Sequence, residues 1–104
     1  MARLTEDAKG VYVIAVTPFT DDGGLDLGSI DSMVDFYEGA GVTGLTVLGQ
    51  LGEAPKLTAE ESRTVVQRVL KRLDGRLPVV VGVSAPGLAP MSELAEAVMG
   101  EGAA

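Results

Sequence analysis

Three largely apolar runs divide this sequence, and they cover residues 11–16 (VYVIAV), 43–48 (TGLTVL) and 77–83 (LPVVVGV). Apolar residues that follow one another without alternation are typical of strands covered on both faces, as in a parallel sheet. Glycine-rich or proline-containing stretches end each run. The pattern predicts strands at about residues 11–17, 44–48 and 78–83.

Helical patterns follow each of these strands. Asp26 is a candidate N-cap, because its carboxylate can accept a hydrogen bond from a free N–H group in the first helical turn. Thr58 and Glu61 have the three-residue spacing of a capping box. Apolar residues recur on one helical face after each cap. The sequence therefore predicts helices over residues 27–39, 59–73 and about 90–99.

The strand-plus-helix unit recurs every 33 to 35 residues, since the strands begin near Val11, Gly44 and Val79. This is the size of a βαβ step with a crossover helix. Three such units suit an open doubly wound sheet or part of a (β/α)₈ barrel. The final GEGAA is similar to the GAGV that leads into the second strand, so we expect a fourth strand to begin there and the chain to be truncated.

A glycine-rich turn after the second strand is the stretch that most suggests chemistry. Gly49 and Gly52 interrupt the sequence TVLGQLGEAP just before a helix. Backbone N–H groups in such a turn have no strand or helix partner, and they can bind an anionic group. The spacing is neither that of a dinucleotide fingerprint nor that of a P-loop. A plain connection between strand and helix is the alternative interpretation.

Composition narrows the functions that this chain can have. It contains no cysteine and no histidine, which excludes a disulfide framework and leaves only carboxylates for a transition metal, so no metal site and no cofactor are expected. The net charge of −7 argues against nucleic acid and anionic membranes as partners. No apolar run approaches the length of a transmembrane helix, and the N-terminus has no apolar signal segment. We expect a cytoplasmic protein of one small α/β domain.

The motifs, taken in order, resemble the N-terminal third of the dihydrodipicolinate synthase / N-acetylneuraminate lyase family. The resemblance runs over nearly the whole of residues 1–104, which it identifies as the N-terminal fragment of a single TIM-barrel domain. Its anchors are the segments Val16–Phe19, Val34–Tyr37, Ala40–Gly44, Val47–Glu53 and Pro78–Val83.

The resemblance implies a (β/α)₈ barrel, usually a homo-oligomer (a tetramer or a dimer), that acts on pyruvate or another small-molecule 2-oxo acid. Members of the family are class I lyases, in which a barrel lysine forms a Schiff base with the substrate. The iminium carbon withdraws electrons, so the adjacent carbon can be deprotonated or released as an enamine. The lysine and its tyrosine partner are expected beyond Ala104, so the resemblance places no catalytic residue within this chain.

The resemblance also implies a substrate-binding set in this chain, composed of Thr17, Gln50, Leu51 and Gly52. Gln50 and Leu51 stand where the family commonly has two hydroxyl residues that contact the substrate carboxylate and the proton relay. A glutamine amide can donate a hydrogen bond but cannot relay a proton as a hydroxyl does, and leucine offers only its backbone N–H. The substrate carboxylate can still bind the backbone of the turn, but the proton relay and the identity of the substrate do not follow from these two residues.

Two neighbouring residues have structural interpretations. Thr17 precedes a proline and can simply close its strand, and Glu53 can serve as a carboxylate near a helix start. Lys56 follows the turn, but its place before a surface helix lacks the desolvated pocket that a nucleophilic lysine needs.

Three alternatives to a dihydrodipicolinate synthase-like activity remain open from the sequence. One is a related 2-keto-3-deoxy sugar acid aldolase or dehydratase. Another is an inactive, truncated barrel fragment that only self-associates through its unpaired strand edges and open apolar face. A stand-alone flavodoxin-type binding domain is disfavoured, because no phosphate loop follows the first strand.

Overall fold

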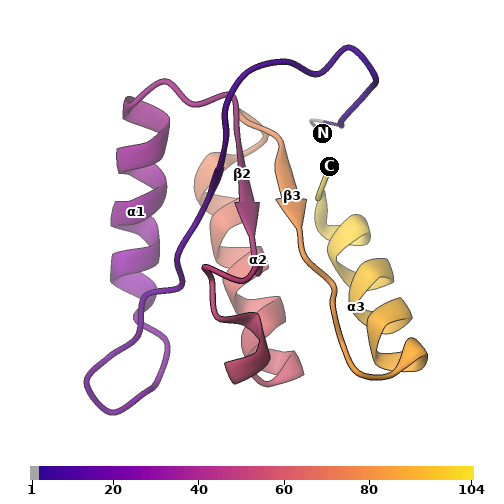
Figure 1. The fold of residues 1–104 in the computed structure, drawn as a ribbon. Helices are drawn as coiled ribbons and strands as arrows, with labels where there is room; N and C mark the ends of the chain where they lie inside the picture. The colour runs from indigo at the N-terminus through magenta and orange to yellow at the C-terminus, as the bar shows by residue number, and fades with distance from the viewer. Residues whose placement is uncertain (1–2) are drawn as a thin grey trace.

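The computed structural model describes residues 3–104, which form three successive βα units (Figure 1). The predicted α/β class is confirmed. The elements are β1 (Tyr12–Ile14), α1 (Leu27–Gly39), β2 (Gly44–Val47), the short 3₁₀ helix η1 (Ala54–Lys56), α2 (Ala59–Leu73), β3 (Val79–Val81) and α3 (Leu88–Glu101).

Helices α1 and α2 have the predicted bounds, whereas α3 and the strands differ from them. Helix α3 is two residues longer at each end than predicted, because Pro90 is tolerated in its first turn and Gly100 continues the helix. The left-handed residue that ends α3 is Gly102, with φ 113°. Each strand is shorter than predicted, since only three or four residues of each run pair with a neighbour.

The three strands form one parallel sheet in the order β1-β2-β3. The register places Leu45 of β2 beside Val13 of β1 on one side and beside Val79 of β3 on the other. The carboxyl ends of all three strands therefore lie at the same end of the sheet.

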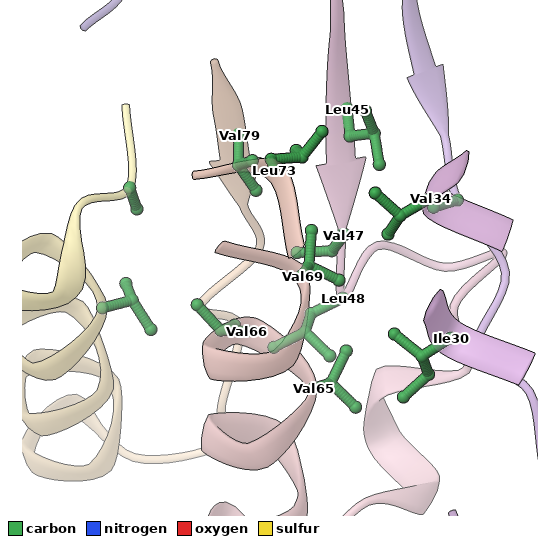
Figure 2. Close-up of a cluster of buried hydrophobic side chains, with 13 residues drawn as sticks. Ile30, Val34, Leu45, Val47, Leu48, Val65, Val66, Val69, Leu73 and Val79 are labelled. Carbon is green, nitrogen blue, oxygen red and sulfur yellow. The ribbon is translucent and has the colours of Figure 1, made fainter. Parts of the chain in front are cut away.

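All three helices cover the same face of the sheet, and the core lies between the helices and the sheet (Figures 1 and 2). Leu45 and Val47 of β2 point into this layer and are 0% and 2% exposed. Their neighbours in the cluster are residues of β3, α1 and α2, namely Val79, Ile30, Val34, Val65, Val66, Val69 and Leu73. Within residues 3–104 no helix covers the opposite face, so the expectation of strands covered on both faces is met on one face only.

Both predicted N-caps are present. The Asp26 carboxylate accepts a hydrogen bond from the Ser29 N–H at 3.0 Å, which lowers the pKa of Asp26 below its ordinary value. The Glu61 N–H donates to the Thr58 hydroxyl at 3.0 Å, and the Thr58 N–H donates to the Glu61 carboxylate at 2.9 Å. Local sequence alone is thus enough to start these two helices.

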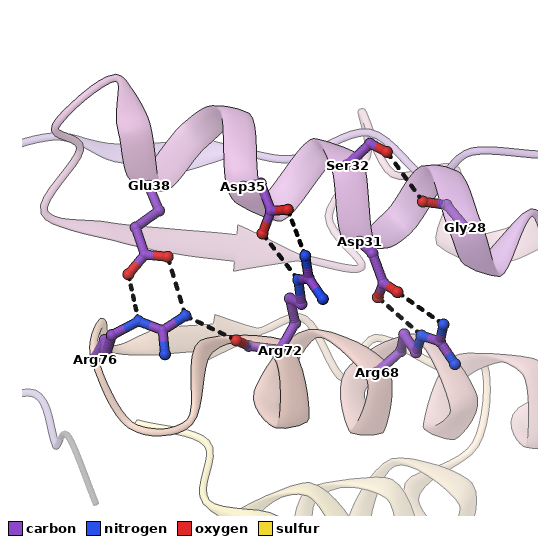
Figure 3. A network of polar contacts seen from close by, with 8 residues as sticks. All are labelled: Gly28, Asp31, Ser32, Asp35, Glu38, Arg68, Arg72 and Arg76. Carbon is purple, nitrogen blue, oxygen red and sulfur yellow. Dashed lines mark hydrogen bonds and ion pairs between the residues drawn. The ribbon is translucent and has the colours of Figure 1, made fainter.

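Three ion pairs join α1 to the second half of α2 and to the turn that follows it, and we call them the α1–α2 ladder (Figure 3). In each pair an arginine donates through Nε and Nη2 to both oxygens of one carboxylate, at 2.6 to 3.1 Å. These hydrogen bonds lower the pKa of all three carboxyl groups. The pairs are Asp31–Arg68, Asp35–Arg72 and Glu38–Arg76.

Candidate functional site

The candidate site lies at the carboxyl ends of the three strands, where the loops that follow them begin. These ends are at the bottom of the sheet in Figure 1. The β1–α1 loop closes on itself: the Thr20 N–H donates to the Gly24 carbonyl oxygen at 2.7 Å. Asp22 in this loop accepts from the Thr20 hydroxyl and from the Gly24 N–H, and these bonds lower its pKa. The polar groups of this loop are therefore largely paired within it.

The β2–α2 turn has few such pairings. It begins at Leu48, a buried leucine held at φ 59°, and ends at Glu53, which has φ 57°. The Glu53 N–H donates to the Gln50 carbonyl oxygen at 3.0 Å. By contrast, the N–H groups of residues 49–52 have no acceptor among residues 3–104. Four consecutive N–H groups thus have no partner within residues 3–104, and Gly52, the last of the four residues, is itself buried.

Thr17 and Gly52 lie against each other at the end of β1. A Cβ atom at position 52 would be 3.2 Å from the Thr17 hydroxyl oxygen and 3.3 Å from the Ala15 carbonyl oxygen, so only glycine fits there without movement. Thr17 is 6% exposed, yet its hydroxyl makes no hydrogen bond within the described part of the chain. The Thr17 hydroxyl, which has no partner within residues 3–104, therefore lies beside Gly52 at the end of the turn.

The other two predicted substrate-binding residues are more open. Gln50 is exposed and its side-chain amide has no hydrogen-bond partner within residues 3–104, and the apolar side chain of Leu51 is 57% exposed. Across the turn, Ile14 of β1 approaches Gly49, since a Cβ there would lie 3.6 Å from the Ile14 Cγ2 atom. The structure thus brings Thr17 and Gly52 together, whereas the side chains of Gln50 and Leu51 extend into solvent.

Gly82 is a supporting residue of this site that sequence reasoning missed. The unusual conformation of Leu48 carries its carbonyl group over Gly82, where a Cβ atom would lie only 2.4 Å from the Leu48 oxygen. The Gly82 N–H donates to the Val47 carbonyl oxygen at 2.9 Å. A glycine within the valine-rich run at residues 77–83 was the available signal, because a glycine there often marks close approach of another backbone.

Lys56 is 71% exposed and its Nζ lies 2.6 Å from the Glu53 carboxylate. An exposed, paired lysine lacks the desolvated surroundings that make an amine nucleophilic at neutral pH. No cluster of three or more His, Cys, Asp or Glu side chains that could hold a metal ion occurs in the described chain. Nor does any helix within residues 3–104 have the length and apolarity needed to cross a membrane.

Comparison with known proteins places this geometry in a family. Residues 7–104 match the dihydrodipicolinate synthetase family. The 4-hydroxy-tetrahydrodipicolinate synthase of Thiobacillus denitrificans is 32% identical over 103 residues, which are 99% of this chain and 34% of that protein. The chain therefore belongs to this family, and the resemblance found in the sequence is confirmed.

Solved structures agree with that assignment. The dihydrodipicolinate synthase of Rhodopseudomonas palustris has a TM-score of 0.93 and 51% identity, covering 99% of this chain and 34% of that one. A chloride-inhibited dihydrodipicolinate synthase from Acinetobacter baumannii, complexed with pyruvate, has a TM-score of 0.83 and 30% identity, covering 88% of this chain and 32% of that one. The three βα units match the N-terminal part of these barrels, and the chain spans about a third of its relatives' length.

Proposed function

We propose that this chain supplies the carboxylate-binding end of a Schiff-base lyase or synthase that acts on pyruvate or a related 2-oxo acid. The observation that carries the proposal is the row of four free N–H groups at residues 49–52, beside the unpartnered hydroxyl of Thr17. Backbone N–H groups of a turn that have no partner in the chain can bind a carboxylate. The pyruvate bound to the Acinetobacter baumannii relative supports the same ligand class.

The nucleophilic lysine of the reaction belongs, in this proposal, to a barrel strand outside this chain. The three lysines of the sequence, Lys9, Lys56 and Lys71, are all exposed. In this proposal the residues of this chain hold the substrate carboxylate. The lysine amine meanwhile converts the 2-oxo carbon into an iminium with loss of water, and a bond to the adjacent carbon is then formed or broken. We also propose that the complete enzyme is a cytoplasmic homo-oligomer, a tetramer or a dimer, that needs no cofactor.

A 2-keto-3-deoxy sugar acid aldolase or dehydratase is the second candidate. It is favoured by Gln50 and Leu51, because neither side chain can relay a proton as a hydroxyl does. A sugar acid substrate carries hydroxyl groups of its own, and one of these could relay the proton in place of a protein hydroxyl. Dihydrodipicolinate synthase-like condensation and sugar acid cleavage share the Schiff base, so both candidates predict the same adduct with pyruvate.

The test is a chimera in which this chain replaces the matching first third of the Rhodopseudomonas palustris synthase. The chimera is incubated with pyruvate and borohydride, and its intact mass is measured. We expect one reduced pyruvate adduct per chain. A folded chimera that gains no mass, while the unaltered synthase gains one adduct, would show that this turn does not accept the carboxylate.

A glycine substitution connects the adduct to the turn. Gly52→Ala places a methyl group 3.2 Å from the Thr17 hydroxyl oxygen and shifts the turn. Losing one hydrogen bond to a charged group costs about 1.5–3 kcal/mol, so we expect the pyruvate concentration for half-maximal trapping to rise about tenfold or more. Gly100→Ala is the matched control, because position 100 lies in α3 with nothing within 4 Å.

A further inference from the structure

Leu48 is a buried leucine in a left-handed backbone conformation at the point where β2 passes into the turn. Its φ is 59° and it is 3% exposed. The other two non-glycine residues with positive φ among residues 3–104, Glu53 and Asp74, are not buried. A bulky apolar residue rarely adopts this conformation, and residues that do so concentrate at ligand-binding sites. The conformation of Leu48 therefore needs a cause, and it suggests a role in the turn.

Burial of the Leu48 side chain explains why the chain leaves the strand conformation here. Side chains alternate between the two faces of a strand, so an extended Leu48 would point with Thr46 away from the helices. Instead, Leu48 belongs to the buried cluster that includes Val65 and Val69 of α2 (Figure 2). Burying a leucine releases free energy of the same size as the cost of a left-handed non-glycine residue. The buried side chain thus holds φ positive.

Gly82 holds the backbone that follows. A Cβ atom at position 82 would lie 2.4 Å from the Leu48 carbonyl oxygen, 3.0 Å from the Leu48 carbonyl carbon and 3.5 Å from the Gly49 nitrogen. The peptide unit between Leu48 and Gly49 therefore packs directly on the backbone of Gly82. Leu48 is fixed both by its side chain and by this peptide.

The φ angle of Leu48 sets the direction in which the turn starts. A parallel strand has φ of about −120°, so the chain beyond the Leu48 Cα is rotated by about 180° from a continuing strand. The carbonyl and N–H groups of a trans peptide point in opposite directions. Because the Leu48 carbonyl oxygen lies against Gly82, the Gly49 N–H points away from Gly82. This N–H is the first of the four that have no acceptor within residues 3–104.

We propose that Leu48 is a positioning residue of the β2–α2 turn. Its left-handed backbone, held by the buried leucine side chain and by Gly82, orients the Gly49 N–H toward the carboxylate of the 2-oxo acid. The inference rests on the proposed function and adds the means by which the site distinguishes a 2-oxo acid from a ketone that has no carboxylate. Leu48 therefore affects binding of the carboxylate and not the reactivity of the lysine.

The test uses branching at Cβ, which changes the backbone preference of a side chain at nearly constant volume. Leu48→Ile keeps the number of side-chain carbons, but a β-branched residue is strongly disfavoured at positive φ. Leu48→Met has no branch at Cβ and fills a similar volume. Leu45→Ile makes the same change at a buried strand position, where a β-branched residue fits, and is the matched control.

Each variant is made in the chimera described above, and initial rates of trapping by borohydride are measured with pyruvate and with acetone, which lacks the carboxylate. With either ketone the lysine amine adds to the carbonyl carbon, water leaves, and hydride reduces the iminium to a secondary amine. Leu48→Ile should lower the ratio of the pyruvate rate to the acetone rate about tenfold, as loss of one hydrogen bond to a charged group does. Leu48→Met and Leu45→Ile should keep the wild-type ratio.

Gly82→Ala is the second variant, for the case in which Leu48→Ile does not fold. Its methyl group displaces the Leu48 carbonyl group and should lower the same ratio. An unchanged ratio in the folded variants, or an equal loss of rate with both ketones, would overturn the role of Leu48. A wild-type chimera that forms no pyruvate adduct would instead refute the proposed function, and this inference with it.

Discussion

The two sides of this sheet differ in how far the chain satisfies its own groups. On the helix side, Leu45 is fully buried and the α1–α2 ladder pairs three carboxylates with three arginines. On the other side, Ile14 is half exposed, and at the carboxyl ends of the strands the N–H groups of residues 49–52 make no hydrogen bond within residues 3–104. The helix side is therefore closely packed and paired, whereas the opposite face of the sheet and the β2–α2 turn keep exposed apolar side chains and N–H groups without a partner among residues 3–104.

The largest expected difference between the two sides is in side-chain truncation. Leu45→Ala removes a fully buried side chain and should lower the free energy of unfolding by about 2–5 kcal/mol. Ile14→Ala, on the sheet face that no helix covers within residues 3–104, should change it by no more than about 0.5 kcal/mol. Urea titration of both variants measures this. Equal losses would mean that Ile14 is packed as closely as Leu45 in this chain.

The next largest effect is expected where the Leu48 carbonyl packs against Gly82 and supports the turn. Gly82→Ala places a methyl group 2.4 Å from the Leu48 oxygen, and the resulting overpacking should cost about 1–3 kcal/mol. Gly100→Ala, in an open helical position, should instead stabilise the chain by up to about 1 kcal/mol. Thermal unfolding followed by circular dichroism compares them. A Gly82→Ala protein as stable as the wild type would mean that Leu48 can leave its unusual conformation at no cost.

The N-cap that follows the turn should have a smaller effect. Thr58→Ala removes the oxygen that accepts from the Glu61 N–H, with an expected loss of about 1 kcal/mol in urea titration. Thr58→Ser keeps the acceptor and serves as the control. If alanine and serine behaved alike, the capping box would not contribute to the stability of α2.

The smallest effect is the pH dependence of the α1–α2 ladder, whose side chains are partly exposed. Its carboxyl groups have a pKa below their ordinary value, so the ladder stabilises the fold above their unfolded pKa of about 4. That contribution should disappear as the pH falls from about 4 through the lower folded pKa values.

The variant Asp31→Asn/Asp35→Asn/Glu38→Gln isolates the ladder, because Asp22 and Asp26 titrate alike in both proteins. The wild type should be more stable than the variant at pH 7, and the difference should shrink below about pH 4. Urea titrations across this range, repeated in high salt, measure it. A difference that did not change with pH would show that the carboxylates act through packing rather than charge.

Local sequence determined most of the fold. The helix starts at Asp26 and Thr58 need only a side-chain oxygen and an N–H group three residues away, so their spacing was sufficient to predict them. The continuous apolar runs likewise located the strands, although their paired lengths were overestimated. The glycines of the turn after β2 also predicted N–H groups without partners, although not that they would be those of residues 49–52.

Only the tertiary structure decided which distant groups meet. Thr17 lies beside Gly52 because β1 and β2 pair in one particular register, and Gly82 is required because the Leu48 carbonyl crosses it. The ladder shows the same limit: the carboxylates of α1 recur at helical spacing in the sequence, but their arginine partners are 37 or 38 residues away. Caps and periodicity are properties of adjacent residues, whereas such contacts depend on how whole elements pack together.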